Sequence, residues 1–289
     1  MKQEGPKRSK AAKPKKGVAR KKSKTPETPP SLEPILAGFA LGAELTPQRE
    51  AQEMVYTAWE TSSHRKRAEL ARKALKLWPD CADAYGVLAQ GPRVTLAERI
   101  KLYRRAVEGA ERSLGKKCFK QNVGYFWGLL ETRPYMRALA SLAQSLWENG
   151  EYVEAIDLYW ELLRLNPSDN QGNRYFLVTW LIAVGRDSEA EKLLAQFDGD
   201  TMAIWLYSRA LLDFRKHGDA PRALAALRLA IATNPHVPQL LTGRKKLPET
   251  LPGYYEMGHI SEAVICVLHS GIAWLATPGA LDWLRRHAA

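Results

Sequence analysis

The sequence predicts an all-α protein, an α-solenoid in which consecutive helix hairpins stack as a right-handed superhelix. Three observations predict this class. Apolar residues recur with helical spacing after the first thirty residues, and no segment alternates apolar and polar residues as a strand does. Small residues and prolines also repeat with a period of about 34 residues, which is typical of stacked hairpins. With 289 residues and 45% hydrophobic content, the chain can form a continuous core.

The first thirty residues hold most of the positive charge. The formal net charge is +12, and residues 1–30 contribute eleven Lys and Arg against Glu4 and Glu27, which leaves +3 for the rest. Because this segment is poor in bulky apolar residues and rich in proline, it predicts a disordered basic tail. Two interpretations stay open, non-specific binding of polyanions such as nucleic acid, or a solubilising leader. The polyanion-binding candidates are Lys7, Arg8, Lys10, Lys13, Lys15, Lys16, Arg20, Lys21, Lys22 and Lys24.

Residues 31–135 are expected to form an N-terminal helical part with degenerate repeats. Thr46 followed by Pro47 predicts a helix start, because Thr caps helices well and Pro is favoured at the first helical position. Further amphipathic helical stretches lie between residues 65 and 115. The distance to the next repeat is too long by about 20 residues for the period, which indicates an insertion near 115–134.

Residues 136–238 are expected to form three successive helix hairpins. In each hairpin a glycine reverses the chain and an alanine lies where the two helices approach, and both markers recur at steps of 35 and 33 residues. A proline ends the first and third hairpins, and these prolines are 68 residues apart. The markers are Gly150, Gly185 and Gly218, then Ala155, Ala190 and Ala223, and Pro167 with Pro235. One hairpin leaves an apolar flank exposed, so we expect neighbouring hairpins to cover it.

Residues 239–289 are expected to form a Pro-rich capping loop followed by C-terminal helices. Four prolines within 234–255 disfavour a helix there. Ser261 is expected to be the N-cap of the next helix, over 261–277. A solenoid must cover the apolar face of its last unit, which gives this segment a structural role.

The hairpin pattern over 136–238 resembles the tetratricopeptide repeat (TPR). Three longer stretches, "FWGLLETRPYMRALA" (126–140), "NPSDNQGNRY" (166–175) and "NPHVPQLLTGRKKLP" (234–248), resemble an uncharacterised group of bacterial TPR proteins. More distantly, they resemble the repeat region of the suppression-of-tumorigenicity-seven family. The resemblance implies a helical array without assigned chemistry. Members of the eukaryotic family look membrane-attached through segments before the repeats, but a Lys-rich tail stands there in this chain, so we expect no membrane attachment.

The sequence lacks the patterns typical of catalytic, metal or cofactor sites. Its six histidines form no His-x-x-x-His pair, its three cysteines form no Cys-x-x-Cys pair, and no Gly-rich phosphate loop is present. We therefore expect neither an enzyme nor a cofactor. No segment is long and apolar enough to span a membrane, and the odd, widely spaced cysteines are typical of a reducing compartment, which predicts a cytoplasmic protein.

We expect the concave face of such an array to bind a protein or an acidic peptide. Arginines on this face suit an acidic partner, because Arg binds carboxylates in bidentate fashion. The groove candidates are Arg133, Arg137, Gln144, Asn173, Arg174, Arg209 and Arg215. The alternative is that these side chains are solvated or form ion pairs within the repeats. In the insertion, Trp127 and Glu131 either line a pocket or belong to a plug between repeats.

These observations favour a non-enzymatic scaffold that mediates protein–protein interaction through its groove. The alternative function is a nucleic-acid- or ribosome-associated factor that is anchored by the basic tail.

Overall fold

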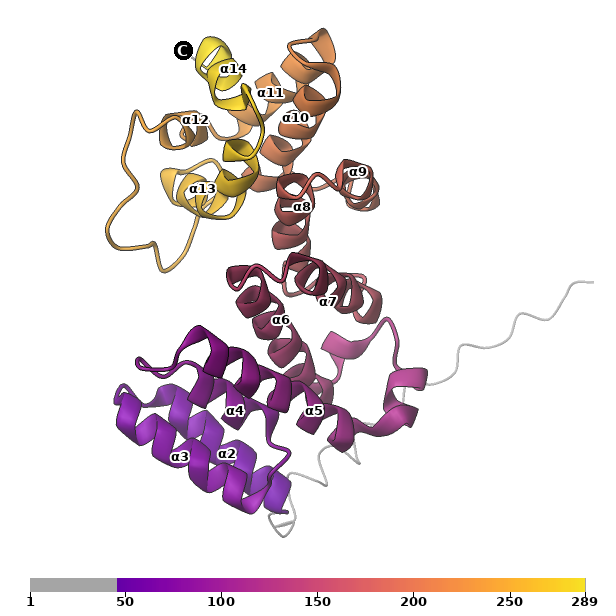
Figure 1. The fold of residues 1–289 in the computed structure, drawn as a ribbon, viewed down its shortest axis with the longest axis vertical. Coiled ribbons are helices and arrows are strands. Elements are labelled where there is room, and N and C mark those ends of the chain that lie inside the picture. Colours follow the sequence, from indigo (N-terminus) through magenta and orange to yellow (C-terminus); the bar gives the residue numbers. More distant parts are fainter. Residues whose placement is uncertain (1–45, 289) are drawn as a thin grey trace, which may run out of the picture. The chain divides into compact units, whose positions relative to one another are not determined.

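The computed structural model describes residues 46–288, whose regular secondary structure is all helical, with no strand (Figure 1). These residues belong to the second of the chain's two compact units, Leu45–Ala289. The prediction of an all-α, TPR-like stack of helix hairpins is confirmed for this unit. The predictions for the basic tail fall on residues 1–30 and lie outside the described part of the chain.

Two hairpins form the N-terminal end of the described unit. Their helices are α2 (Pro47–Glu60), α3 (His64–Leu77), α4 (Ala82–Ala89) and α5 (Leu96–Gln121). As predicted, α2 begins after Thr46, whose hydroxyl accepts a hydrogen bond from the backbone N–H of Arg49. A small core of mostly alanine side chains joins α2, α3 and α4.

The segment 115–134, where the repeat period predicts an insertion, first continues α5 and then turns. Gly115 interrupts α5 with φ +66°, and the helix then resumes as far as Gln121. Two 3-10 helices follow, η1 (Phe126–Gly128) and η2 (Leu130–Thr132). The Phe126 ring is fully buried against Phe119 and Tyr135, so the segment packs into the core at this end.

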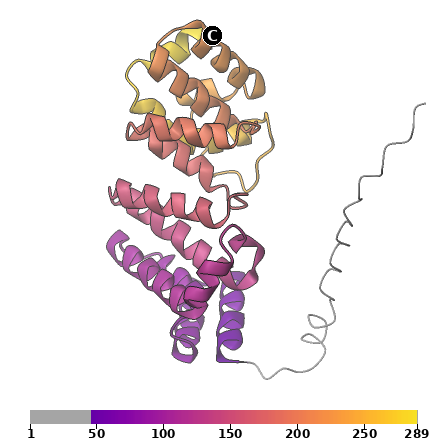
Figure 2. The same ribbon diagram turned by 90° about the vertical axis from the view of Figure 1, so that its right-hand side faces the viewer.

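Three hairpins follow in the order that the repeat predicts, and Figure 2 shows them stacked one upon the next. Their helices are α6 (Arg133–Glu148) with α7 (Tyr152–Leu165), α8 (Asn173–Ala183) with α9 (Asp187–Gln196), and α10 (Ala203–His217) with α11 (Pro221–Thr233). The marker alanines are fully buried, and the marker glycines take the positive φ predicted for them, +86° at Gly150, +79° at Gly185 and +66° at Gly218. Trp147 of α6 stacks on Trp180 of α8 at 4.4 Å, which joins two successive hairpins.

The C-terminal segment contains α12 (Val237–Leu241), α13 (Ile260–Leu275) and α14 (Ala280–His287). The expectation of no helix in 234–255 is wrong for α12, because Pro238 stands in the first turn, where no backbone N–H is needed. The expected N-cap Ser261 is also corrected. The cap is His259, whose ring accepts a hydrogen bond from the backbone N–H of Ser261.

Candidate functional site

The first helices of the three hairpins, α6, α8 and α10, line one side of the stack, which we call the inner face. Helix α13 packs across α8 and α10 on this face (Figure 1). The ring of His269 in α13 lies 4.3 Å from that of Phe176 in α8, and Trp274 packs near Tyr207 in α10. The chain therefore covers the inner face of its last two hairpins with its own C-terminal helix.

Helices α8 and α10 bury polar side chains as well as apolar ones. Thr179 of α8 and Ser208 of α10 are buried, and Leu212 in the second half of α10 is buried as well. The corresponding side of α6 is only half-buried, at Arg137, Ala140 and Gln144. Helix α13 has no extensive contact with α6, and these half-buried side chains of α6 lie beside or within a depression that α2 and α4 also line.

A buried carboxylate fixes α13 in place. Glu262 is 2% exposed and accepts three hydrogen bonds, from the backbone N–H groups of Ala203 (2.9 Å) and Gly258 (2.7 Å) and from the amide of Asn234 (2.9 Å). These donors come from the start of α10, the end of α11 and the turn before α13. A buried carboxylate is stable only when it is hydrogen-bonded in this way, so the network ties three segments together.

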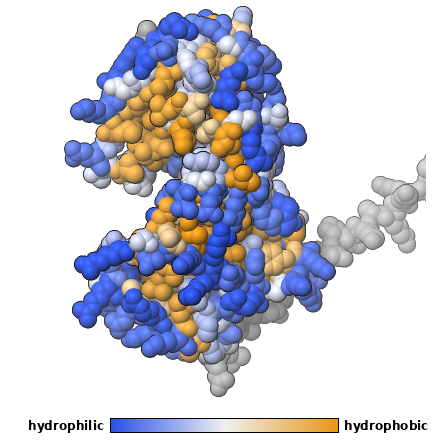
Figure 3. Space-filling model, in the orientation of Figure 1, coloured by the Kyte–Doolittle hydropathy of each residue, from blue (hydrophilic) through white to orange (hydrophobic). Residues whose placement is uncertain are grey.

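Two neighbouring depressions lie along the inner face, one at α6 and one beside α13, and together we call them the inner cleft. One, of about 210 Å³, is lined by α2, α4, α5 and α6, and the other, of about 330 Å³, by α8, α10, α13 and the loop before α13. Gln171, in the turn between α7 and α8, lines both. Figure 3 shows the surface hollowed at this level, at the left of the view.

Arg137 and Asp83 form the polar wall of the smaller depression. The Asp83 carboxylate accepts hydrogen bonds from Nε (3.0 Å) and Nη2 (2.5 Å) of Arg137 and from Nε2 of Gln52 (3.0 Å). The guanidinium also lies over the ring of Trp59, 5.3 Å from its centroid. Asp83 is 5% exposed, and the guanidinium of Arg137 neutralises its buried charge. This pairing also holds the Arg137 side chain in one orientation.

Arg174 has the same role beside the larger depression. Its guanidinium pairs with Asp169 (3.0 Å) and Asp200 (2.8 Å) and lies over the ring of Phe197. Asp169 also accepts the backbone N–H groups of Asn173 and Arg174 and so caps α8. Burial raises the pKa of the Asp169 carboxyl, and these hydrogen bonds act against that rise.

The other predicted groove residues are engaged elsewhere in the fold. Arg209 pairs with Asp198 (2.9 Å), Arg215 pairs with Asp187 (3.0 Å), and the amide of Gln144 donates to the hydroxyl of Tyr159 (3.2 Å). Asn173 is buried, and Arg133 donates to the carbonyl of Trp127. Of the seven candidates, Arg137 and Arg174 line the inner cleft. The pairing favours the alternative interpretation, ion pairs within the repeats, for most of these guanidinium groups.

Trp127 and Glu131 have different surroundings. Trp127 is half-buried against the main core, with Arg133 stacked on its ring at 5.3 Å. Glu131 lines a separate depression beside α2 and α5. The structure thus favours the plug for Trp127, and a joint pocket of these two residues stays a prediction.

Sequence reasoning missed the acidic half of the inner cleft. Asp83, Asp169 and Asp200 hold the two arginines, and Gln171 joins the two depressions, but none of them stands out by spacing. The available signal was the polar turn "SDNQGN" (168–173), which is richer in charge and amide groups than a repeat needs.

Two cysteine thiols are unsuited to chemistry at neutral pH. Burial raises the pKa of Cys81 to about 11 and that of Cys266 to about 12, so both are protonated. Within residues 46–288, no three His, Cys, Asp or Glu side chains are grouped as a metal site would require. No helix of this part combines the length and apolar character needed to cross a bilayer.

Comparison with known proteins relates the chain to the ST7 family. No family model matches it. A "Protein ST7 homolog" of Drosophila pseudoobscura pseudoobscura is 27% identical over 82% of this chain and 48% of its own length. "Suppressor of tumorigenicity 7 protein-like" of Bos taurus is 26% identical, over 82% of this chain and 46% of its own length. The matched region therefore spans about half the length of these relatives.

Among solved structures, YrrB, described as a TPR protein with an unusual peptide-binding site, aligns with 62% of this chain and 84% of its own. The alignment has a TM-score of 0.41 and 20% sequence identity. The chain is TPR-like by its own stacked helix hairpins, and its sequence resembles the ST7 family. Its resemblance to a bacterial TPR group stays a prediction.

Proposed function

We propose that this chain, a TPR-like relative of the ST7 family, is a non-enzymatic scaffold that binds a segment of another protein in the inner cleft. The observation that supports the proposal is that α13 packs on α8 and α10 but leaves two depressions that meet at Gln171, one at α6 and one beside α13. A repeat protein that covers part of its inner face and keeps the rest accessible offers a binding surface of defined length.

The walls of the cleft suit a peptide backbone with apolar side chains. Arg137 uses Nε and Nη2 on Asp83, while its Nη1 has no hydrogen-bond partner within residues 46–288. Arg137 lines the smaller depression, and we infer that its Nη1 donates to a peptide carbonyl oxygen there. The rings of Trp59 and Tyr255 at the two ends offer apolar contact.

The acidic preference expected for the groove is not part of this proposal. Arg137 and Arg174 are already paired with the buried carboxylates Asp83 and Asp169. The cleft therefore has little net charge to attract an acidic segment, and binding there depends on shape and backbone hydrogen bonds.

The proposal is tested by selecting peptides from a displayed random-peptide library on the full chain and measuring their affinity by fluorescence anisotropy. Ala140→Trp places a large ring in the smaller depression, and we expect the selected peptides to bind at least about tenfold more weakly to this variant, which is about 1.4 kcal/mol. Ala225→Trp, at an exposed position on α11, is the matched control and is expected to keep their affinity.

Peptides that bind both variants equally would place binding outside the inner cleft. A library from which no peptide is enriched would contradict the scaffold function itself.

A further inference from the structure

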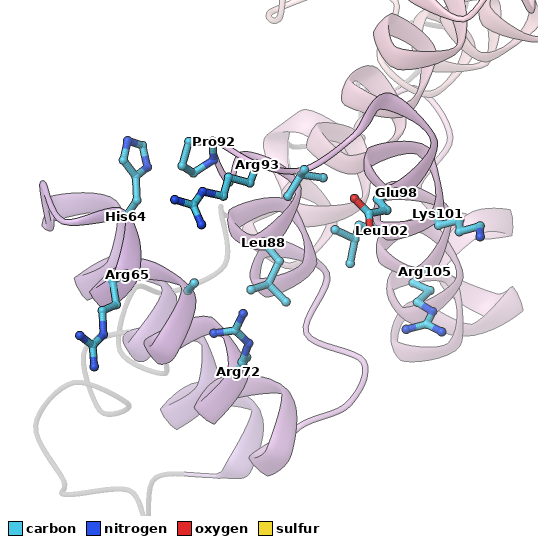
Figure 4. A pocket seen from close by; sticks show the side chains of 13 residues that line it. His64, Arg65, Arg72, Leu88, Pro92, Arg93, Glu98, Lys101, Leu102 and Arg105 are labelled. Carbon is cyan, nitrogen blue, oxygen red and sulfur yellow. The ribbon is translucent and has the colours of Figure 1, made fainter.

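A second depression lies at the N-terminal end of the described unit, away from the inner cleft. It measures about 790 Å³ and is bounded by α3, the connection between α4 and α5, and the first half of α5 (Figure 4). It shares no lining residue with the inner cleft. We call it the basic depression.

The floor of the basic depression is apolar. Leu88 of α4, Val94 of the connection and Leu102 of α5 are half-buried, and Ala68 of α3 completes the lining. Figure 4 shows Leu88 and Leu102 pointing toward the space between the helices. A recessed floor of this kind buries the apolar side chains of a bound partner, which is the main favourable term in association.

The rim of the basic depression is strongly cationic. Its lining includes five Lys and Arg side chains, which come from all three bounding segments: Arg65, Arg72, Arg93, Lys101 and Arg105. All five are exposed. None of them forms an ion pair with a carboxylate of residues 46–288, although that part of the chain pairs most of its other arginines.

Helix α5 shows the contrast within a single element. On one side, Arg104 binds Glu154 in bidentate fashion (2.7 and 2.9 Å) and Arg99 pairs with Glu148 (3.0 Å), which ties α5 to the next hairpin. On the other side, Lys101 and Arg105 border the basic depression without such partners. The cations of the two sides therefore have different roles, and those on the depression are available to an external anion.

The single carboxylate of the lining is committed to the start of α5. Glu98 accepts hydrogen bonds from both the backbone N–H (3.0 Å) and the hydroxyl (2.9 Å) of Thr95, which completes a capping box. These hydrogen bonds hold the pKa of the Glu98 carboxyl below its usual value. Glu98 is thus occupied by Thr95 and forms no ion pair with the cationic rim.

We propose that the basic depression binds an acidic amphipathic helix of a partner protein. An apolar stripe at i, i+3, i+4 and i+7 fits a recessed apolar floor, and carboxylates on both flanks of the stripe meet Arg72, Arg93 and Arg105 on the rim. The lining has no Trp, Tyr or Phe on which a nucleotide base stacks, so a nucleic acid would leave the floor unused. A helix is also able to enter the depression and contact its recessed floor, whereas the flat surface of a bilayer is not.

The test uses three synthetic, fluorescein-labelled peptides of about five helical turns each. The first has a leucine stripe flanked by Glu, the second replaces the leucines with Ser, and the third replaces Glu with Lys. Binding to the full chain is measured by fluorescence anisotropy. We expect the first peptide to bind at least about tenfold more tightly than the other two, and its affinity to fall as salt is added.

Two variants locate the binding. Arg72→Glu combined with Arg105→Glu reverses charge on both sides of the depression and is expected to weaken the first peptide at least about tenfold. Arg228→Glu changes an exposed arginine on α11 and is expected to leave its affinity unchanged. Both changes are at exposed positions, and an unchanged circular dichroism spectrum confirms that the variants are folded.

Several results would overturn the proposal. If the serine peptide binds as tightly as the leucine peptide, the apolar floor does not contribute to binding. If the Arg72→Glu/Arg105→Glu variant and the Arg228→Glu variant lose equal affinity for the first peptide, the peptide does not bind in the basic depression. Displacement of the first peptide by phosphatidylserine vesicles or by a short RNA, with tighter binding of either, would assign the cations to a membrane or a nucleic acid. Ala140→Trp is expected to leave this binding intact, so failure here is distinguishable from failure of the inner cleft.

Discussion

At the scale of single residues, buried carboxylates determine where the accessible surface lies. Asp83 and Asp169 neutralise the arginines of the inner cleft, and Glu262 holds α13 over α8 and α10. Two of the three were not predictable from spacing, since Asp83 meets Arg137 across 54 positions of sequence and Glu262 meets Ala203 across 59. Helical periodicity indicates which side of a helix is apolar, but it does not indicate which distant residue meets a charged group.

Replacing Glu262 by Ala is expected to destabilise the protein by about 2–4 kcal/mol, because two buried donors and one half-buried donor lose their acceptor at once. Urea denaturation followed by circular dichroism measures this difference in the free energy of unfolding. Glu249→Ala, at an exposed loop position, is the control and is expected to change stability by less than about 0.5 kcal/mol. Similar midpoints for the two variants would show that the Glu262 network does not stabilise the fold.

At the scale of helices and hairpins, sequence reasoning was most successful where one local rule acts. The marker glycines and alanines, the three hairpins of 136–238 and the capped start of α2 follow from turn geometry, small-residue contacts and capping. The position of α13 does not follow from such rules. The sequence of α8, "NRYFLVTWLIA", does indicate that a further helix packs on it. This helix is apolar on nearly every side, so its own hairpin partner does not bury all of its apolar surface.

A matched pair of glycine variants tests the turn rule. Gly150 has φ +86° and open space around it, so Gly150→Ala introduces no clash and its cost is the backbone conformation alone, about 1–2 kcal/mol. Gly199 also lies in open space between α9 and α10, but without a positive φ, and Gly199→Ala is expected to be neutral or slightly stabilising. Thermal unfolding of both variants measures the difference, and equal melting temperatures would contradict the assignment.

At the scale of the described unit, the packing is uneven. One core of large side chains runs from α4 to α14, whereas a separate, smaller core holds α2 and α3 mainly through alanines such as Ala51, Ala58, Ala71 and Ala74. An alanine buries less apolar surface than a leucine or an aromatic side chain, so α2 and α3 gain less from packing. The basic depression is partly built from α3 and shares this weaker support.

We therefore expect α2 and α3 to open before the hairpins of α8 and α10. In hydrogen exchange followed by mass spectrometry at increasing urea, amides of 47–77 are expected to exchange at lower urea than amides of 203–217. Exchange of both segments at the same urea concentration would mean that the two cores unfold as one cooperative unit.

The hydrogen bond from Ala203 to Glu262 has a consequence for biosynthesis. The ribosome completes α8 and α10 well before it reaches α13, and at about 5–20 residues per second the 59 positions between these two residues take several seconds. During that interval the apolar side chains of α8 and α10 that α13 later covers are exposed to solvent. Nascent chains are expected to need a chaperone at this stage, and the need ends when translation delivers the last helices.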